Sequence, residues 1–354
     1  MLRTLFRFAV AAILLGMPTA ALPKGAPPEA TLSRGEVITK LAPSPAHFSI
    51  LLPPGYAAGG HPYSLVLLLH GGGGSDEDLA RLEPLIEMAW ANGDLPPAVV
   101  VMPDADRSLY IDYRDGSQKW DTFIVSELVP YLRAHYNLSK ERSQSVVIGA
   151  SMGGEGALTL GFRHPEVFGA IAALEPGIAP SLSYHDLKVR NRFWRTDAFF
   201  EERFGKPVDE NWYKEFNPAN LAICNRAQIL SSSLAIYLDV GANDMFNLDE
   251  GAEFLHRVLW DQGIPHEYHL VLGADHLGRT LAPRFLEAFR FLKEHSLAPP
   301  GPDMTPRLVD ALRRVTRWKA EAGVDVKARR PPFPSLDATL DGSGICPATD
   351  PIRQ

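Results

Sequence analysis

The chain has 354 residues, of which 45% are hydrophobic and 22% charged, the composition of a globular rather than a disordered protein. Its formal net charge of −7 provides no basic footprint for binding DNA or RNA. With only two cysteines, Cys224 and Cys346, the chain can form neither a disulfide-rich scaffold nor a cysteine-rich zinc site. The sequence leaves open whether these two cysteines pair, although an oxidising compartment would permit it.

The first residues have the layout of a secretory signal peptide. Arg3 and Arg7 form a basic start, the apolar stretch Phe8–Met17 follows, and small residues lead up to Ala21. The apolar stretch is shorter than the roughly 20 residues needed to span a bilayer. We therefore predict that residues 1–21 are a signal peptide and that the mature protein is periplasmic or secreted, without a stable membrane anchor. An uncleaved anchor is the alternative.

Between residues 36 and 296, short apolar runs alternate with segments of helical periodicity. This alternation predicts one α/β domain, with a mostly parallel sheet flanked by helices. The clearest helix is Trp120–His135, where large apolar side chains recur on one stripe, and two more are predicted at Asp249–Gln262 and Pro283–His295. The predicted strands are Phe48–Leu52, Ser64–Leu69, Ala98–Met102, Ser145–Ala150, Ala170–Leu174, Leu234–Val240 and Tyr268–Leu272.

A glycine-rich loop, His70–Gly74, directly follows one of these strands. Acyl-transfer sites need N–H donors aimed at the developing oxyanion, and glycines let the backbone approach the substrate closely. We assign the N–H of Gly72 as one such donor. We interpret His70 as an anchor of this loop through side-chain hydrogen bonds rather than as a catalytic base.

The motif Gly149-Ala150-Ser151-Met152-Gly153 lies where a predicted strand ends and a helical stretch, Gly156–Arg163, begins. This context is the one that the Gly-x-Ser-x-Gly nucleophile elbow requires. We predict that Ser151 is a nucleophile on a strained turn, that side chains at the flanking glycines would collide with their neighbours, and that the N–H of Met152 is the second oxyanion donor. The alternative is a glycine-rich turn with an idle serine.

A third segment, residues 181–220, is rich in aromatic side chains and lies between two strands. We predict that it is a small helical cap inserted into the domain. The cap aromatics either contact a substrate acyl group or form the core of the cap itself. Tyr110 and Tyr113, in an earlier loop, are candidates for lining the pocket, with simple exposure on that loop as the alternative.

A serine nucleophile needs a histidine base and a carboxylate that orients it, and in this fold the acid precedes the histidine. Asp244 lies in the turn after one predicted strand, and His276 lies in the loop after the next. Both loops therefore lie at the same sheet edge as Ser151. We predict the catalytic residues Ser151, Asp244 and His276, with Glu175 as the other candidate acid. Asp275 adjoins His276, which points the two side chains apart.

Residues 299–354 form a Pro-rich C-terminal extension that carries nine of the 30 prolines. One helix is predicted in it, Thr305–Ala320, and we predict that the extension is dispensable for folding and activity. The alternative is that the extension belongs to the fold, with the helix docked on the domain and Cys346 tied to Cys224. The apolar side chains available for such docking are Val309, Leu312, Val315 and Trp318.

Four stretches resemble the esterase D-type branch of the α/β-hydrolases. They are His70–Gly74, Gly149–Gly154, Asp239–Asp244 and Gly273–His276. That branch includes tributyrin, feruloyl and acetylxylan esterases, S-formylglutathione hydrolases and antigen 85-type acyltransferases. The resemblance covers about residues 36–296 and implies an α/β-hydrolase fold, a serine esterase with the triad given above, and no cofactor.

The sequence departs from that branch at two positions. Glu155 stands where a neutral or aromatic residue is expected, which affects the charge of the pocket. Leu277 follows His276 where such enzymes often carry an aromatic residue, which implies a more open leaving-group side.

The leading hypothesis is an exported serine carboxylic ester hydrolase that forms an acyl-enzyme and acts on a small-molecule or carbohydrate-linked ester. The first alternative is an acyltransferase that uses the same triad on a sugar or lipid hydroxyl. The alternative of a different class is a non-catalytic binding protein with this fold, and the complete triad counts against it. No metal is expected, because the chain has neither a His-Glu-x-x-His motif nor a cysteine cluster.

Overall fold

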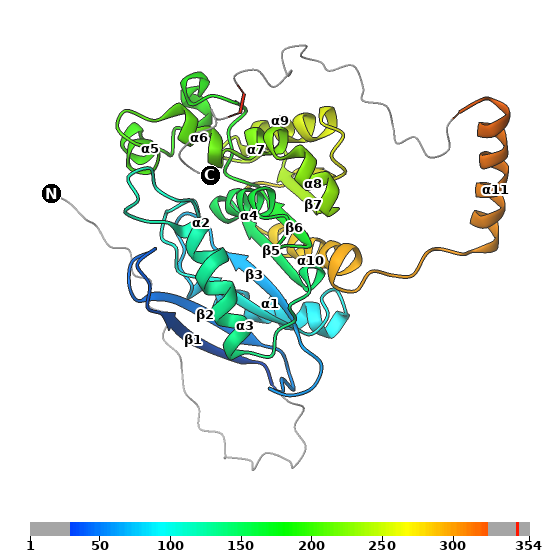
Figure 1. Ribbon diagram of the computed structural model, residues 1–354, viewed down its shortest axis with the longest axis horizontal. Coiled ribbons are helices and arrows are strands. Elements are labelled where there is room, and N and C mark those ends of the chain that lie inside the picture. The colour runs from blue at the N-terminus through cyan, green and yellow to red at the C-terminus, as the bar shows by residue number, and fades with distance from the viewer. Residues whose placement is uncertain (1–28, 325–344, 347–354) are drawn as a thin grey trace.

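A single eight-stranded sheet forms the centre of the molecule (Figure 1). The computed structural model describes residues 29–324 and 345–346, so the predicted signal peptide lies outside the described residues. The strand order is β1-β2-β4-β3-β5-β6-β7-β8; β2 is antiparallel to both of its neighbours, β1 and β4, and β3 to β8 are parallel to one another. The strands are β1 Thr31–Val37, β2 Ala46–Leu52, β3 Ser64–Leu69, β4 Ala98–Pro103, β5 Ser145–Ala150, β6 Ala170–Leu174, β7 Ala235–Gly241 and β8 Glu267–Val271.

Helices cover both faces of this sheet. α1 and α10 pack on one face, and α2, α3, α4 and α9 pack on the other. The helices are α1 Asp78–Asn92, α2 Trp120–Phe123, α3 Val129–His135, α4 Met152–Arg163, α5 Asp197–Phe204, α6 Glu210–Phe216, α7 Pro218–Cys224, α8 Arg226–Ser232, α9 Leu248–Asp261, α10 Leu281–Leu292 and α11 Pro306–Glu321. None of the helices within residues 29–324 is both long and apolar enough to cross a membrane.

The buried strands explain why apolar runs predicted the sheet so well. All six residues of β3 are buried, and successive side chains enter different cores, because strand side chains alternate between the two faces. Leu65 and Leu67 join the core beneath α4, whereas Val66 and Leu68 join the core beneath α1 and α10. The predicted α/β-hydrolase sheet is therefore confirmed. The predicted helix Trp120–His135 is also present, as α2, a π-helical turn and α3 in succession.

The edge strand β1 and the helix α1 were not predicted from the sequence. β1 is an edge strand that pairs only with β2, and most of its side chains are partly or fully exposed, so it contains no apolar run. The sheet consequently begins at Thr31, ahead of the predicted start at residue 36. α1 contains Pro84 and buries only three side chains, which weakens its helical pattern.

The segment between β6 and β7 forms the helical cap, with α5, α6, α7 and α8. The predicted end of the cap at residue 220 falls inside α7. Phe200, Phe204, Tyr213 and Phe216 are buried within it, so these aromatics form the core of the cap. Phe193, in contrast, is 54% exposed.

The C-terminal extension is tied to the cap at its far end. Cys346 forms a disulfide with Cys224 at the end of α7, across 122 positions of sequence. Next to it, Ile345 is buried and its carbonyl accepts a hydrogen bond of 2.8 Å from Asn220 Nδ2. These contacts oppose our prediction that the extension is structurally dispensable. They favour the alternative in which Cys346 is tied to Cys224. The docked helix that was the second part of this alternative is not found, because α11 buries no residue against the domain.

We expect reduction of this disulfide to lower the melting temperature without abolishing activity. Closing a loop of this length stabilises a fold by about 5 kcal/mol in the chain-entropy model, or on the order of 10 °C for a domain of this size. Melting curves of the wild type with and without reductant measure the effect. Cys346→Ser should melt like the reduced wild type and should not respond to reductant. Equal melting temperatures for all four samples would contradict the prediction.

Candidate active site

The turn at Ser151 has the strained strand-to-helix geometry that a nucleophile elbow requires. Ser151 sits between β5 and α4 with φ 58° and ψ −121°, a conformation that non-glycine residues rarely adopt. A Cβ on Gly149 would lie 2.4 Å from the carbonyl carbon of Gly153, and a Cβ on Gly153 would lie 2.1 Å from Leu69 O. Both glycines are therefore required for the turn that presents Ser151 at the end of the sheet.

The glycine-rich loop lies against this elbow. A Cβ on Gly71 would be 3.8 Å from Ser151 Cβ, and a Cβ on Gly72 would be 3.7 Å from Met152 Cβ, which is van der Waals contact. The loop after β3 and the start of α4 thus meet at Ser151. This brings together the two residues, Gly72 and Met152, whose N–H groups we assigned to the oxyanion.

His70 anchors this loop. Its Nε2 accepts a hydrogen bond of 3.1 Å from the Ala105 N–H, which leaves the ring proton on Nδ1 to be donated to Gly71 O at 2.8 Å. Burial lowers the pKa of His70, so the ring stays neutral. Both ring nitrogens are occupied by backbone groups, which supports an anchoring role and not that of a base.

Tyr110 is a second anchor, which the sequence analysis did not identify. Its side chain is fully buried, and its hydroxyl donates a hydrogen bond of 3.0 Å to His70 O. Tyr113 is buried as well, so neither of the two tyrosines is exposed on its loop or lines the cavity at Ser151. The contact between Tyr110 and His70 spans 40 positions and leaves no local signal in the sequence.

The predicted acid and base are in direct contact. His276 Nδ1 donates to Asp244 Oδ2 at 2.8 Å, and both side chains are almost completely buried. The other carboxylate oxygen, Asp244 Oδ1, accepts from the Phe246 N–H at 2.8 Å, which fixes the orientation of the carboxylate. The Phe246 ring then packs edge-on against the His276 ring, with centroids 4.7 Å apart.

Asp275 joins the two loops that carry the acid and the base. Its Oδ1 accepts from the His276 N–H at 2.7 Å and from the Met245 N–H at 2.9 Å. Its carboxylate therefore holds backbone and does not contact the imidazole, as its place beside His276 in the sequence suggested. This bridge sets the distance between the loop after β7 and the loop after β8.

Glu175, the other candidate acid, is also close to His276. Among the residues that the structure describes, Glu175, Asp244 and His276 form the one group of three or more acidic, cysteine or histidine side chains whose ligand atoms all lie within 4.8 Å of one another. Glu175 Oε2 accepts a hydrogen bond of 2.9 Å from Arg284 Nη1, and Arg284 also donates hydrogen bonds to Asp239. Each member of the group already has a protein partner, so we interpret it as a proton-handling group rather than as a metal site.

Burial raises the pKa of Glu175 to about 7, although Arg284 and His276 act in the opposite direction. The folded protein therefore keeps this proton in a pH range where the unfolded chain has lost it. The free energy of unfolding consequently falls as the pH rises from about 4.5 to about 7, by at most about 3 kcal/mol from this group.

We expect Glu175→Gln to remove that loss. Because glutamine does not ionise, the free energy of unfolding of the variant minus that of the wild type should increase from about pH 5 to about pH 8, by up to about 3 kcal/mol. Urea unfolding of both proteins at about pH 5 and at about pH 8 measures this increase. Other titrating groups are common to both proteins and cancel. A stability difference that is the same at both pH values would contradict the assignment.

A cavity of about 760 Å³ opens above Ser151. His276, Glu175 and the loop His70–Gly74 line its base, so the predicted nucleophile and base share one cavity. Its walls are mainly apolar and come from β4, α1, α10, the cap and the loops after β7 and β8. They include Leu82, Met102, Trp194, Phe246, Leu277, Leu281 and Phe285. The site is thus large enough for an ester with an apolar group on either side of its carbonyl.

The two departures from the family pattern have different structural consequences. Glu155 in α4 is paired with Arg195 of the cap at 2.5 Å, and Arg195 Nη1 also donates to Gly177 O at 2.9 Å. Burial raises the pKa of Glu155, and Arg195 opposes this effect. The Glu155 side chain therefore ties the cap to α4. Leu277 is 60% exposed at the cavity mouth, which agrees with an open leaving-group side.

The sheet order, the elbow after β5 and the acid and histidine after β7 and β8 define an α/β-hydrolase. A family model described as "Putative esterase" matches residues 40–291 of the chain. The chain belongs to this esterase family, as its resemblance to the esterase D-type branch implied.

Sequence similarity to individual proteins agrees with the assignment to the esterase family. The chain is 32% identical over 241 residues to Esterase Rv1288 of Mycobacterium tuberculosis, a match that covers 64% of this chain and 51% of that protein. The chain thus spans about half the length of the curated relatives that it matches first. A shorter match, 34% identical over 98 residues, covers 23% of this chain and 29% of the diacylglycerol acyltransferase/mycolyltransferase Ag85B of Mycobacterium avium.

Solved structures show the same fold. A ferulic acid esterase matches with a TM-score of 0.62 at 19% identity and covers 76% of this chain and 99% of its own. An S-formylglutathione hydrolase from Agrobacterium tumefaciens matches with a TM-score of 0.60 at 17% identity and covers 78% of this chain and 99% of its own. These likenesses show the α/β-hydrolase fold.

Proposed function

We propose that this chain is an exported serine carboxylic ester hydrolase that acts through an acyl-enzyme. Ser151 is the nucleophile, His276 the base, and Asp244 the carboxylate that orients His276. The N–H groups of Gly72 and Met152 hold the oxyanion. The observation that carries the proposal is the 2.8 Å contact between Asp244 and His276 at the wall of the cavity that contains Ser151.

In the first half-reaction, Ser151 Oγ attacks the ester carbonyl while His276 Nε2 takes the hydroxyl proton. Nδ1 of the ring is bonded to Asp244, which selects the tautomer with a free Nε2 and stabilises the imidazolium that forms. The tetrahedral intermediate then collapses. The C–O bond of the ester breaks, and the alcohol leaves with the proton from His276.

In the second half-reaction, water takes the place of the alcohol. His276 removes a proton from the water as it attacks the acyl-enzyme, and Ser151 regains its proton when the acid leaves. No cofactor is needed for either half-reaction. The apolar walls of the cavity support a substrate with an apolar acyl or alcohol group, in the form of a small-molecule or carbohydrate-linked ester.

Labelling with a fluorophosphonate probe tests the proposal directly. We expect one modified peptide, carrying the label on Ser151, and no label on Ser151→Ala. Rates on p-nitrophenyl acetate to palmitate, methyl ferulate and acetylated xylan would then define the substrate class. A folded protein that is neither labelled nor active on any of these esters would instead be a non-catalytic binding protein with this fold.

Two observations support export. The N-terminal segment has the basic and apolar layout of a signal peptide. The disulfide between Cys224 and Cys346 is of the kind that persists in oxidising compartments such as the periplasm and the extracellular space. We therefore propose a periplasmic or secreted location.

An acyltransferase is the second candidate, and the match to Ag85B favours it. The chemistry differs only in the second half-reaction, where a sugar or lipid hydroxyl attacks the acyl-enzyme in place of water. Adding glycerol or trehalose during ester turnover separates the two functions. Acylated acceptor in excess of free acid would identify a transferase, whereas free acid alone would identify a hydrolase.

A further inference from the structure

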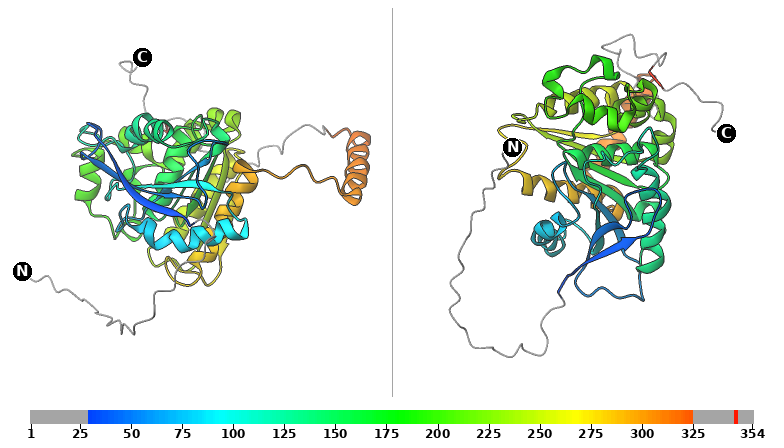
Figure 2. Two further views of the ribbon diagram at one scale, coloured as in Figure 1. Left: turned by 90° about the horizontal axis from the view of Figure 1, so that it is seen from below. Right: turned by 90° about the vertical axis from the view of Figure 1, so that its left-hand side faces the viewer.

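Helix α11 stands apart from the catalytic domain. It has 16 residues, none of them buried, and the stretch 298–305 that leads to it is exposed as well. Figures 1 and 2 show the helix projecting away from the sheet and its covering helices. The proposed reaction uses no residue of this helix.

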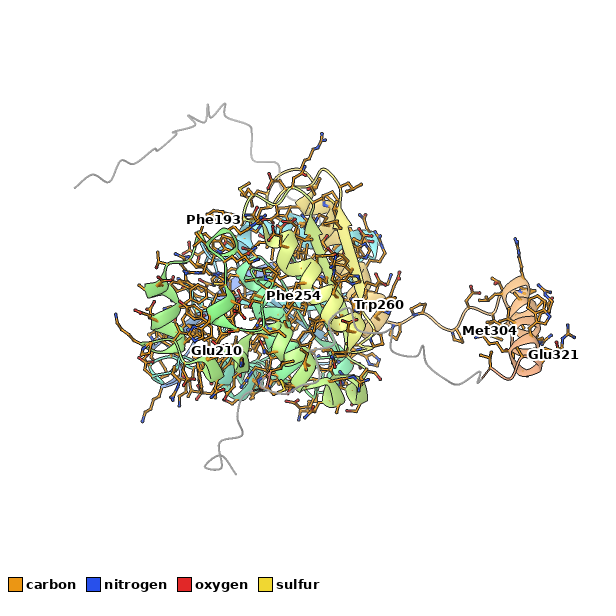
Figure 3. All side chains as sticks on the ribbon, turned by 90° about the horizontal axis from the view of Figure 1, so that it is seen from above. Phe193, Glu210, Phe254, Trp260, Met304 and Glu321 are labelled. Atoms are coloured by element: carbon orange, nitrogen blue, oxygen red, sulfur yellow. A yellow bond between two sulfur atoms is a disulfide. The ribbon has the colours of Figure 1, made fainter. Side chains whose placement is uncertain are left out.

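The helix has two chemically different faces. At 100° per residue, its five large apolar side chains fall within about half of the circumference, an arc of about 180°. Leu308, Leu312, Val315 and Trp318 are 37%, 54%, 40% and 56% exposed, and Val309 at the edge of the arc is partly exposed. The other half carries Arg307, Arg313, Arg314 and Arg317, whereas Lys319 lies among the apolar side chains. Figure 3 shows this helix apart from the rest of the molecule, with Met304 labelled just ahead of it and Glu321 at its end.

The charge of the helix is opposite to that of the whole chain. α11 has five basic side chains, including Lys319, and only two acidic ones, Asp310 and Glu321. The chain as a whole has a formal net charge of −7. Positive charge is thus concentrated on the one helix whose apolar side chains lack a covering element in the part of the chain that the structure describes.

We propose that α11 is an interfacial helix that binds an anionic lipid surface. A strongly charged face rich in arginine, opposite a stripe of leucine, valine and tryptophan, is the pattern of helices that lie in the plane of a membrane interface. The apolar stripe enters the boundary between headgroups and acyl chains. The arginines contact the lipid phosphates, and Trp318 sits at the depth that indole rings favour.

The helix lies on the surface and does not span it. Sixteen residues rise about 24 Å, less than the hydrocarbon core of about 30 Å, and charged residues interrupt the helix at every turn. Such binding is reversible and depends on salt, because screening weakens the attraction of the arginines to anionic lipid. The proposal is independent of the proposed esterase activity, since it concerns only where the catalytic domain is held.

Co-sedimentation of the full chain with lipid vesicles tests the proposal. We expect partitioning onto phosphatidylcholine vesicles that contain phosphatidylglycerol to exceed partitioning onto phosphatidylcholine alone by at least about tenfold, and to fall at high salt. Leu312→Glu should abolish this preference, because it places a carboxylate in the apolar stripe. Replacing Arg313, Arg314 and Arg317 by glutamine should reduce binding to the level seen with phosphatidylcholine alone.

Ala320→Glu is the matched control, since it adds the same charge on the polar face, where we expect a far smaller effect. All variants keep the N-terminal apolar segment, so differences among them report on α11. The rate on a soluble ester should stay unchanged throughout. Equal binding to both kinds of vesicle, or undiminished binding by Leu312→Glu, would overturn the proposal. So would a lowered melting temperature or a change of oligomeric state in Leu312→Glu, which would assign the stripe to the catalytic domain or to a second copy of the chain.

Discussion

Ser151→Ala is expected to lower ester turnover by at least about three orders of magnitude while leaving the melting temperature unchanged. Without the nucleophile, only oxyanion stabilisation and substrate binding remain, and the members of a triad act as a unit. Alanine differs from serine by one oxygen atom, and the close packing around the elbow comes from Gly149 and Gly153, which the substitution leaves in place.

Turnover of p-nitrophenyl acetate and thermal melting should be measured on the same preparation. Ser126→Ala is a suitable control, because it removes an exposed hydroxyl outside the cavity. It should retain full activity. A folded Ser151→Ala protein with activity near that of the wild type would require a different nucleophile.

Asp244→Asn is expected to lower kcat by about three to four orders of magnitude, the scale known for loss of the triad acid. An amide in place of the carboxylate can present its NH₂ group to Nδ1, which would favour the tautomer that has its proton on Nε2. That tautomer cannot accept the proton of Ser151. The amide also fails to stabilise the imidazolium.

Glu175→Gln is the matched comparison, because it replaces the other buried carboxyl group near His276 by an amide, and the ligand atoms of Glu175, Asp244 and His276 all lie within 4.8 Å of one another. We expect a loss of no more than about tenfold, since the contact of Glu175 is with Arg284 and glutamine can still accept that hydrogen bond. Steady-state rates of the two variants at one pH decide the question. A larger loss in Glu175→Gln would assign the triad acid to the loop after β6.

The parts of the fold that could be predicted from sequence are those with a local signature. β3, β5 and β6 are continuous apolar runs, because both their faces are buried. The elbow was predictable for a similar reason, since its motif occupies five consecutive residues, 149–153, and Gly149 packs against Gly153 within that motif.

The supporting contacts have no such signature. Arg284 binds Glu175 across 109 positions, and Tyr110 binds His70 across 40, so no spacing or periodicity marks them. The cysteine pair was left open for the same reason, because its formation depends on a Cα–Cα distance of 5.6 Å between segments 122 positions apart. Such pairings follow from the completed fold.

The disulfide between Cys224 and Cys346 makes a covalent ring from the last third of the chain. Asp244, His276 and all of α11 lie inside this ring. One proteolytic cut in the exposed stretch 298–305 therefore opens the ring but releases nothing, and the two fragments separate only after reduction. A protein nicked once outside the cell would keep α11 attached to the catalytic domain for as long as its surroundings remained oxidising.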